Sequence, residues 1–352
     1  THTGIKTEMN NQRFQNWMTV IVLALVGACP TAQAQTSARQ AIIRYDSIHH
    51  PEVALHGMVV SQNDLASEIG RDILRQGGNA IDAAVATGFA LAVTLPRAGN
   101  LGGSGFMLVH LAESGETVAL DYRSVAPLAS NSRLFQTADG EINWTALTHG
   151  AKAAGVPGTV AGFYEAWQRW GTLPWKDLLA PAQKLAADGI VVSHDLAFAL
   201  SEGAKTMGQF ASSSAIYLHP DGRGWRAGER LVQTDLARSI TWIMEGGADA
   251  FYRGELAEQI AAAFEADGGL ITQADLAGYE VRERALVATD YRGFRVVSMP
   301  PVSAGGITLI QMLNMLSEFD VAPMGAGSVA HLHLLAEVMK RAAANRRTWL
   351  GD

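Results

Sequence analysis

The segment from residue 81 to residue 95 is apolar around nearly its whole circumference when drawn as a helix, and Pro96 ends it. Such a helix has no face for water, so it must be buried on most sides. Asn79 is expected to cap it, and the glycine pair 77–78 to end an earlier helix capped by Ser61 with Asp64 as its partner. The chain must therefore pack other elements around this segment.

A glycine-rich loop at 100–105 leads into a β-rich stretch at 106–111, and a turn at 113–116 separates it from a second β-rich stretch at 118–123. Two such stretches joined by a short turn predict a hairpin. Because side chains alternate between the two faces of a strand, Ala119, Asp121 and Arg123 are expected to share one face. The hairpin thus presents an acidic and a basic side chain together.

The remaining apolar patterns are mainly helical. They predict helices at 159–170, 175–187, 193–207, 236–245, 255–266, 307–319 and 329–347. Thr272 with Asp275 is a further capping signature, and β-rich segments at 286–289 and 294–299 flank a turn. This order of elements fits an α+β or layered αββα domain and does not fit alternating βαβ units.

Composition limits the classes of protein that the 352 residues can form. Hydrophobic residues make up 48% and charged residues 17%, which supplies a sizeable core and excludes disorder as the main state. The 27 basic residues against 34 acidic ones give a net charge of −7, which argues against a nucleic-acid partner. No linker or internal repeat interrupts residues 51–352, which are therefore assigned to one domain.

The N-terminal residues follow the order of an export signal. Arg13 supplies a positive charge, residues 20–28 an apolar run, and Ala32-Gln33-Ala34 a small-x-small cleavage pattern. The apolar run is far shorter than the ~18–20 residues of a membrane-spanning helix. Cleavage is expected after Ala34, which gives a periplasmic or secreted mature protein.

Residues 1–34 are accordingly assigned to upstream residues plus a signal peptide, and the polar residues 35–50 to a flexible lead-in. Cys29, directly after Val26-Gly27-Ala28, leaves a lipoprotein as the alternative. Cleavage after Ala34 would leave a mature chain without cysteine, which suits an oxidising compartment.

Other kinds of chemistry find little support in the motifs. The glycine-rich loop follows a helix and precedes a strand, the reverse of a phosphate-binding loop. His331 and His333 would point about 200° apart on a helix, and no third ligand joins His333 and Glu337, so no metal site is predicted. Cys29 lies in the targeting segment, Thr1 precedes it, and no Gly-x-Ser-x-Gly elbow is present, so no nucleophile is predicted in this chain.

Asp121 and Arg123 permit two interpretations. They can form a surface ion pair with each other, which contributes little stability. Alternatively Arg123, at the end of its strand, can present its planar guanidinium to a substrate carboxylate. The residues alone leave both interpretations open.

Several segments, in order along the chain, together resemble the gamma-glutamyltranspeptidase family. The matching strings are residues 77–84 (GGNAIDAA), 100–107 (NLGGSGFM), 121–127 (DYRSVAP), 156–162 (VPGTVAG), 291–293 (YRG), 298–301 (SMPP), 303–306 (SAGG) and 350–352 (LGD). They occur in the family's order, and the resemblance spreads over roughly residues 51–352. One string alone would be a weak signal, whereas their ordered co-occurrence is specific.

The resemblance implies an N-terminal-nucleophile hydrolase fold, an αββα sandwich of which this chain holds the large-subunit part. Members of the family are precursors that cut themselves into two subunits, and the new N-terminal threonine of the small subunit is the nucleophile. It takes the γ-glutamyl group of glutathione and passes it to water or to an amino-acid or peptide acceptor. That threonine would lie beyond Asp352, so this chain alone is expected to be inactive, with its own small subunit as partner and no cofactor.

The family's motif also implies a role for Arg123, which matches the arginine that binds the α-carboxylate of the γ-glutamyl group. Many relatives have a glutamate after that arginine, where this chain has Ser124, and four glycines where Ser104 interrupts the run. The first departure puts the tightness of carboxylate binding in doubt. Arg123 is the one substrate-binding residue assigned.

Three functions remain as hypotheses. The first is the large-subunit portion of an exported gamma-glutamyltransferase or glutathione hydrolase. The second is a related acylase acting on another amide, such as a glutaryl-β-lactam or a poly-γ-glutamate. The third is a non-catalytic periplasmic scaffold of the same fold.

Overall fold

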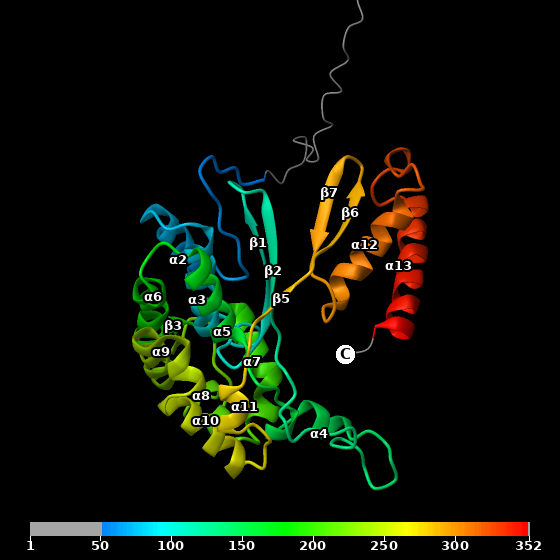
Figure 1. Cartoon of the computed structure of the whole chain (residues 1–352). Coiled ribbons are helices and arrows are strands. Elements are labelled where there is room, and N and C mark those ends of the chain that lie inside the picture. Colours follow the sequence, from blue (N-terminus) through cyan, green and yellow to red (C-terminus); the bar gives the residue numbers. More distant parts are fainter. Residues whose placement is uncertain (1–50, 351–352) are drawn as a thin grey trace, which may run out of the picture. The chain divides into compact units, whose positions relative to one another are not determined.

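Figure 1 shows the computed structural model, which describes residues 51–350. The predicted signal peptide, the lead-in, Cys29 and Gly351-Asp352 lie outside the described residues. The division of the chain into domains stays a prediction.

Helix α3 (Ala80–Thr94) is buried along most of its length, as its apolar sequence requires. The Asn79 side chain accepts hydrogen bonds from the backbone N–H groups of Ile81 and Asp82, which confirms the predicted cap. The fully buried Asp82 carboxylate accepts the Asn79 N–H at 2.9 Å and the Thr172 hydroxyl at 2.6 Å. Asp82 therefore fastens the start of α3 to a segment ninety residues further along the chain.

The preceding helix, α2 (Asp64–Arg75), begins differently from the prediction. Asn63, and not Ser61, is its N-cap, with Oδ1 accepting the N–H of Ala66 at 3.2 Å. The Ser61 hydroxyl instead donates to the carbonyl of Asn63 at 2.9 Å and lies 2.8 Å from the Ser67 hydroxyl. The predicted Ser61 cap is wrong because the helix begins at Asp64, which puts Asn63 in the N-cap position and Ser61 two residues before it.

The predicted hairpin is confirmed and is part of a three-stranded antiparallel sheet. Strands β1 (Gly105–Leu111) and β2 (Glu116–Tyr122) pair along their whole length, and β5 (Arg282–Arg284) pairs with the other edge of β2. The register sets Asp121 opposite Arg282 and Ala119 opposite Arg284. The third strand thus brings residues from far along the chain onto the face that carries Asp121.

Helices cover the opposite face of this sheet (Figure 1). Tyr122 packs edge-on against Phe163 of α5 (Thr159–Trp170), with ring centroids 5.9 Å apart. Gly162 permits this approach, because a Cβ there would lie 2.2 Å from Tyr122 Cγ. Phe163 in turn packs on Phe89 of α3, so one aromatic cluster joins the sheet to the buried helix.

The remaining helices extend this layer: α6 packs on both α3 and α9, and α10 packs on α9. Their bounds are α6 (Trp175–Asp188), α7 (His194–Met207), α8 (Ala211–Tyr217), α9 (Thr234–Tyr252), α10 (Glu255–Ala266) and α11 (Gln273–Ala277). Short elements between them are α4 (Trp144–Thr148), η1 (Ala151–Ala153), β3 (Ile190–Val191) and β4 (Arg230–Leu231). The capping box of Thr272 and Asp275 is confirmed at α11. The predicted helix at 236–245 is only the first part of α9, which continues past a non-helical Gly247.

The C-terminal elements confirm the second β pair and the two helices predicted after it. Strands β6 (Val287–Tyr291) and β7 (Phe294–Ser298) form a hairpin that packs on α12 (Ala304–Leu316), and α12 packs on α13 (Val329–Trp349), with η2 (Ala322–Met324) between these helices. Together with the first sheet they confirm the α+β class. Within residues 51–350, no helix is long and apolar enough to span a membrane.

Candidate functional site

Arg123 directly follows β2, and the protein holds its main chain on both sides. Its N–H donates to Asp121 Oδ1 at 2.9 Å, and its carbonyl accepts the Tyr279 hydroxyl at 2.9 Å. Burial, together with the negative charge of Asp121, raises the pKa of Tyr279 above its usual range, while the positive charge of Arg282 lowers it. The Tyr279 hydroxyl therefore stays protonated as a donor. The position from which the Arg123 side chain extends is thus fixed.

Of the two interpretations of Asp121 and Arg123, the surface ion pair is wrong. Asp121 is only 4% exposed, and its Oδ2 accepts from Arg284 of β5 at 2.9 Å (Nε) and 2.8 Å (Nη2). The carboxylate is thereby divided between two tasks: Oδ1 fixes the main chain of Arg123, and Oδ2 binds the guanidinium of Arg284. Asp121 therefore supports the main chain of Arg123 from a buried position and forms no ion pair with the Arg123 guanidinium.

The side chain of Arg123 lines a pocket of about 310 Å³. The other lining residues come from the end of β2, from β5 and from single flanking positions: Asp121, Ser124, Val125, Ala126, Glu280, Arg282, Arg284 and Val302. Among the described residues, no carboxylate lies within 4.0 Å of the Arg123 guanidinium. An exposed arginine on a fixed main chain, with no carboxylate partner among the described residues, can bind an incoming carboxylate.

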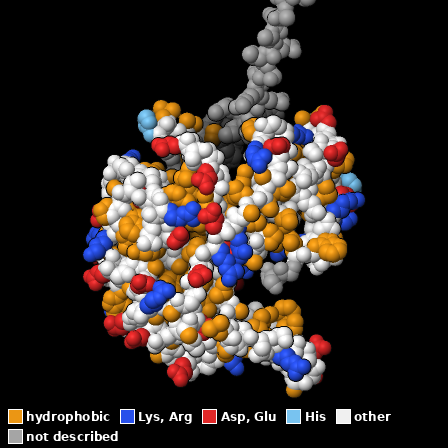
Figure 2. Space-filling model, in the orientation of Figure 1, with side chains coloured by type: hydrophobic (Ala, Val, Ile, Leu, Met, Phe, Trp, Pro, Cys, Tyr) orange, Lys and Arg blue, Asp and Glu red, His pale blue; other side chains and the backbone are white. Residues whose placement is uncertain are grey.

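Basic side chains gather over the part of the molecule where β5 runs (Figure 2). Strand β5 contributes Arg282 and Arg284 to the pocket lining, on the same strand face as Asp121. The charge of Arg284 is matched by Asp121, whereas that of Arg282 is not matched by an ion pair in the region the structure describes. The pocket is therefore electropositive and suits an anionic ligand.

The glycine-rich loop lies beside this pocket and has a packing role. The Gly103 carbonyl accepts the N–H groups of Gly158 and Thr159 at 2.9 and 3.1 Å, at the start of α5. A Cβ at Gly158 would lie 2.1 Å from the carbonyl oxygen of Tyr122 and 2.0 Å from the Tyr279 hydroxyl. The Ser104 hydroxyl approaches the Ser124 hydroxyl at 3.5 Å. The glycines thus let two chain segments close against the residues that hold Arg123.

A larger cavity of about 590 Å³ lies among α8, α9 and α10. Its walls include the apolar stripe Leu256, Ile260 and Phe264 of α10, and its charged lining residue is Asp235. A cavity whose one charged lining residue is acidic does not suit an anionic donor, so the Arg123 pocket is the better candidate.

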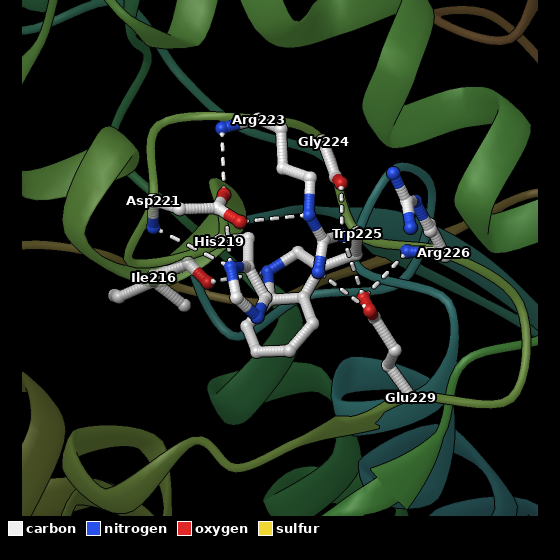
Figure 3. A network of polar contacts seen from close by, with 8 residues as sticks. All are labelled: Ile216, His219, Asp221, Arg223, Gly224, Trp225, Arg226 and Glu229. Carbon is white, nitrogen blue, oxygen red and sulfur yellow. Dashed lines mark hydrogen bonds and ion pairs between the residues drawn. The ribbon is translucent and has the colours of Figure 1, made fainter.

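A polar network at residues 216–229 is a second cluster of charged side chains (Figure 3). Arg223 lies between two carboxylates, donating to Glu229 at 2.6 and 3.0 Å and to Asp221 at 2.9 Å. The His219 ring lies 2.9 Å from Asp221 and packs edge-on against Trp225. Arg223, Asp221, Glu229 and His219 satisfy one another, so the network stabilises its own loop.

This network predicts an acid sensitivity. The hydrogen bond from Arg223 lowers the pKa of Glu229 from 4.5 to about 2. A carboxylate whose pKa is lower in the folded state contributes stability that is fully present above pH 4.5 and is lost as the pH falls from about 4.5 to about 2. We expect Glu229→Gln to lower the urea midpoint at pH 7, and the difference from wild type to shrink by pH 2.5. A difference independent of pH would contradict this origin.

Comparison with known proteins agrees with the resemblance seen in the sequence. The family model described as gamma-glutamyltranspeptidase matches residues 66–352. The glutathione hydrolase proenzyme of Escherichia coli is 43% identical over 336 residues, which are 94% of this chain and 57% of the relative. The acylase ACY 1 proenzyme of Pseudomonas sp. SE83 is 39% identical over 308 residues, 86% of this chain and 55% of that protein.

A solved structure gives the same result. The crystal structure of Helicobacter pylori gamma-glutamyltranspeptidase superposes with a TM-score of 0.84 at 42% identity, covering 86% of each chain. Fold and neighbours thus define an N-terminal-nucleophile hydrolase, which confirms the predicted class. Within that class, the chain belongs to the gamma-glutamyltranspeptidase family. It spans about half the length of the curated relatives that it matches.

The sequence did not predict three residues of this site: Tyr279, which binds the Arg123 carbonyl, and Arg282 and Arg284, which line the pocket. The strand that carries the two arginines is only three residues long and entirely charged. The available signal was the alternation of Arg282 and Arg284, which puts two cations on one strand face, where a lone buried acid could find a partner. The assignment of Arg123 as a substrate-binding residue stays a prediction.

Proposed function

We propose that residues 51–352 form the donor-binding part of an exported gamma-glutamyltransferase or glutathione hydrolase that is made as a precursor. The observation that carries this proposal is Arg123, an exposed residue that lines the pocket and whose main chain is held by Asp121 and Tyr279. Its planar fork matches a carboxylate, such as the α-carboxylate of a γ-glutamyl group. The relatives named glutathione hydrolase support this choice of donor.

In the proposed reaction, the threonine hydroxyl of the small subunit attacks the γ-carbonyl carbon of the donor. The carbon–nitrogen bond breaks, the leaving amine takes up the hydroxyl proton, and a γ-glutamyl ester remains on the threonine. Water or an acceptor amine then attacks the ester and returns the proton to the threonine. The residues around Arg123 contribute orientation, since they hold the far end of the γ-glutamyl group while its carbonyl reacts.

The test uses the full-length protein with glutathione as donor. Release of cysteinylglycine with formation of glutamate, or of γ-glutamylglycylglycine when glycylglycine is added, is the expected result. Residues 1–352 alone should release neither product. The absence of turnover by a folded, processed full-length protein would contradict the proposal.

The acylase alternative is favoured by the relative named ACY 1. A glutaryl group carries a carboxylate at the same distance from its amide as a γ-glutamyl group and lacks only the α-amine. The Arg123 pocket therefore accommodates both carboxylates, and the function has to be decided by assay. Faster turnover of the glutaryl 4-nitroanilide than of the γ-glutamyl 4-nitroanilide would identify an acylase.

Export is part of the same proposal and predicts a defined mature N-terminus. The ordered charge, apolar run and Ala32-Gln33-Ala34 place cleavage after Ala34. Mass spectrometry of the protein from the expressing cells should find Gln35 as the first residue. A lipid-modified Cys29 would show the lipoprotein alternative instead, and a mature chain that begins at Met9 would contradict both.

A further inference from the structure

Arg123 lies between two pairings of the main chain. The register of β2 with β5 ends at Asp121, opposite Arg282, and the chain pairs next at Val125. There the N–H of Val125 donates to the Val156 carbonyl at 3.3 Å, and its carbonyl accepts the Val156 N–H at 2.8 Å. Between these two points, side chains hold the N–H and the carbonyl of Arg123.

The hydroxyl of Tyr279 that binds the Arg123 carbonyl is itself fixed by packing. Tyr279 comes two residues after α11, is 9% exposed, and stacks on Tyr252 at the end of α9, with ring centroids 5.6 Å apart and an interplanar angle of 14°. The Tyr252 hydroxyl donates to the Pro157 carbonyl at 2.9 Å and accepts the Ala161 N–H at 3.2 Å. Burial raises the pKa of both tyrosines, so both hydroxyls stay protonated. The Arg123 carbonyl is thus tied to the helical layer.

The two hydrogen bonds of the Arg123 main chain act on different peptide planes. The bond to Asp121 fixes the plane before the Arg123 Cα, and the bond from Tyr279 fixes the plane after it. The direction of the Cα–Cβ bond depends on both planes, and bidentate binding of a carboxylate by a guanidinium requires a defined direction. Gly158 lets the Tyr279 hydroxyl reach this carbonyl, because a Cβ at residue 158 would lie 2.0 Å from the hydroxyl oxygen.

We propose that Tyr279 is a positioning residue for the donor: by binding the Arg123 carbonyl, its hydroxyl sets the direction in which the Arg123 side chain meets the donor carboxylate. This inference rests on the proposed function. Tyr279 acts through Arg123, because its ring is buried and its hydroxyl is bound to the Arg123 carbonyl. Without that hydroxyl, Arg123 keeps its charge but loses one of its two fixed planes. The carboxylate should then bind more weakly, while the bond-breaking step is unaffected.

The experiment uses Tyr279→Phe in the full-length protein, which removes the hydroxyl and keeps the stacked ring. The two donors are γ-glutamyl 4-nitroanilide and its analogue with the α-carboxylate converted to an amide. On the free-carboxylate donor, kcat/KM should fall about 3- to 10-fold, mainly through KM, and on the amidated donor less than about 2-fold. In an Arg123→Ala background, Tyr279→Phe should have no further effect on kcat/KM, because the residue through which it acts is absent.

Tyr252→Phe is the matched control. It removes a neighbouring buried hydroxyl that binds the Pro157 carbonyl, and it leaves the bond from Tyr279 to Arg123 in place. Both variants should lower the thermal midpoint, but Tyr252→Phe should leave the ratio of the two donors unchanged.

Three results would overturn the inference: equal losses on both donors in Tyr279→Phe, the same change of the donor ratio in Tyr252→Phe, or a further loss in the Arg123→Ala background. Failure of the wild-type protein to turn over either donor would instead contradict the proposed function, so the two failures are distinguishable.

Discussion

Replacing Arg123 with alanine in the full-length protein is expected to lower kcat/KM by about two to three orders of magnitude on a γ-glutamyl donor with a free α-carboxylate. Charge-assisted hydrogen bonds contribute ~1.5–3 kcal/mol each, and a bidentate pair contains two of them. A loss of ~1.4 kcal/mol corresponds to a tenfold change in rate. Arg123→Lys keeps the charge and loses the planar fork, so it should recover only part of the activity.

The thermal midpoint should hardly change in either variant, because the Arg123 guanidinium is exposed and has no ion-pair partner among the described residues. The decisive comparison uses a donor whose α-carboxylate is converted to an amide. Arg123→Ala should lose little further activity on that donor. An equal loss on both donors would show that Arg123 does not bind the α-carboxylate.

Most of the helical layer could be predicted from the sequence, because its signals are local. The cap at Asn79, the apolar run of α3 and the stop at Pro96 lie within twenty residues and agree with one another. The bounds of α5 were predicted without error for the same reason. At α2 the same kind of local signal failed: it predicted Ser61 as the cap, whereas Asn63, two residues later, is the cap.

The site was predictable only in part, because its contacts join residues far apart in the sequence. Arg123 could be singled out from its motif, but the partner of Asp121 lies 163 residues away on a strand with no apolar pattern. A sequence presents Arg123 as the obvious neighbour of Asp121, two positions along. In the structure Asp121 forms its ion pair with Arg284 instead. Arg123 is therefore not half of an ion pair with Asp121, and its guanidinium is available to bind a ligand.

The ion pair between Asp121 and Arg284 should therefore be the main support of the site, and breaking it from the arginine side is expected to be costly. In Arg284→Met the nearly buried Asp121 carboxylate keeps, within residues 51–350, the N–H of Arg123 as its one close donor. Removing one partner of a buried pair costs ~3–5 kcal/mol, and the partial exposure of Arg284 places this case at the lower end. A fall of several degrees in the thermal midpoint is expected.

The asparagine variant isolates the second task of Asp121. In Asp121→Asn the side-chain oxygen can still accept the Arg123 N–H, whereas in Asp121→Ala it cannot. Both lose the ion pair, but Arg284 can turn toward water, so the loss of stability should be smaller than in Arg284→Met. If Asp121 positions Arg123, Asp121→Ala should lower kcat/KM on the free-carboxylate donor more than Asp121→Asn does, and the amidated donor should not show this difference.

The double variant Asp121→Asn with Arg284→Met completes the argument. It removes both charges, so no buried carboxylate is left unpaired, and much of the stability lost in Arg284→Met should return. If the ion pair had only a structural role, the double variant would recover stability and activity together. If residue 121 positions Arg123, activity should depend on the presence of a hydrogen-bond acceptor at residue 121. Activity should then persist in the double variant, where the asparagine oxygen still accepts the Arg123 N–H. It should fall in the double variant that has alanine at residue 121 instead. Equal activity of those two double variants would show that Arg123 does not depend on Asp121 for its position.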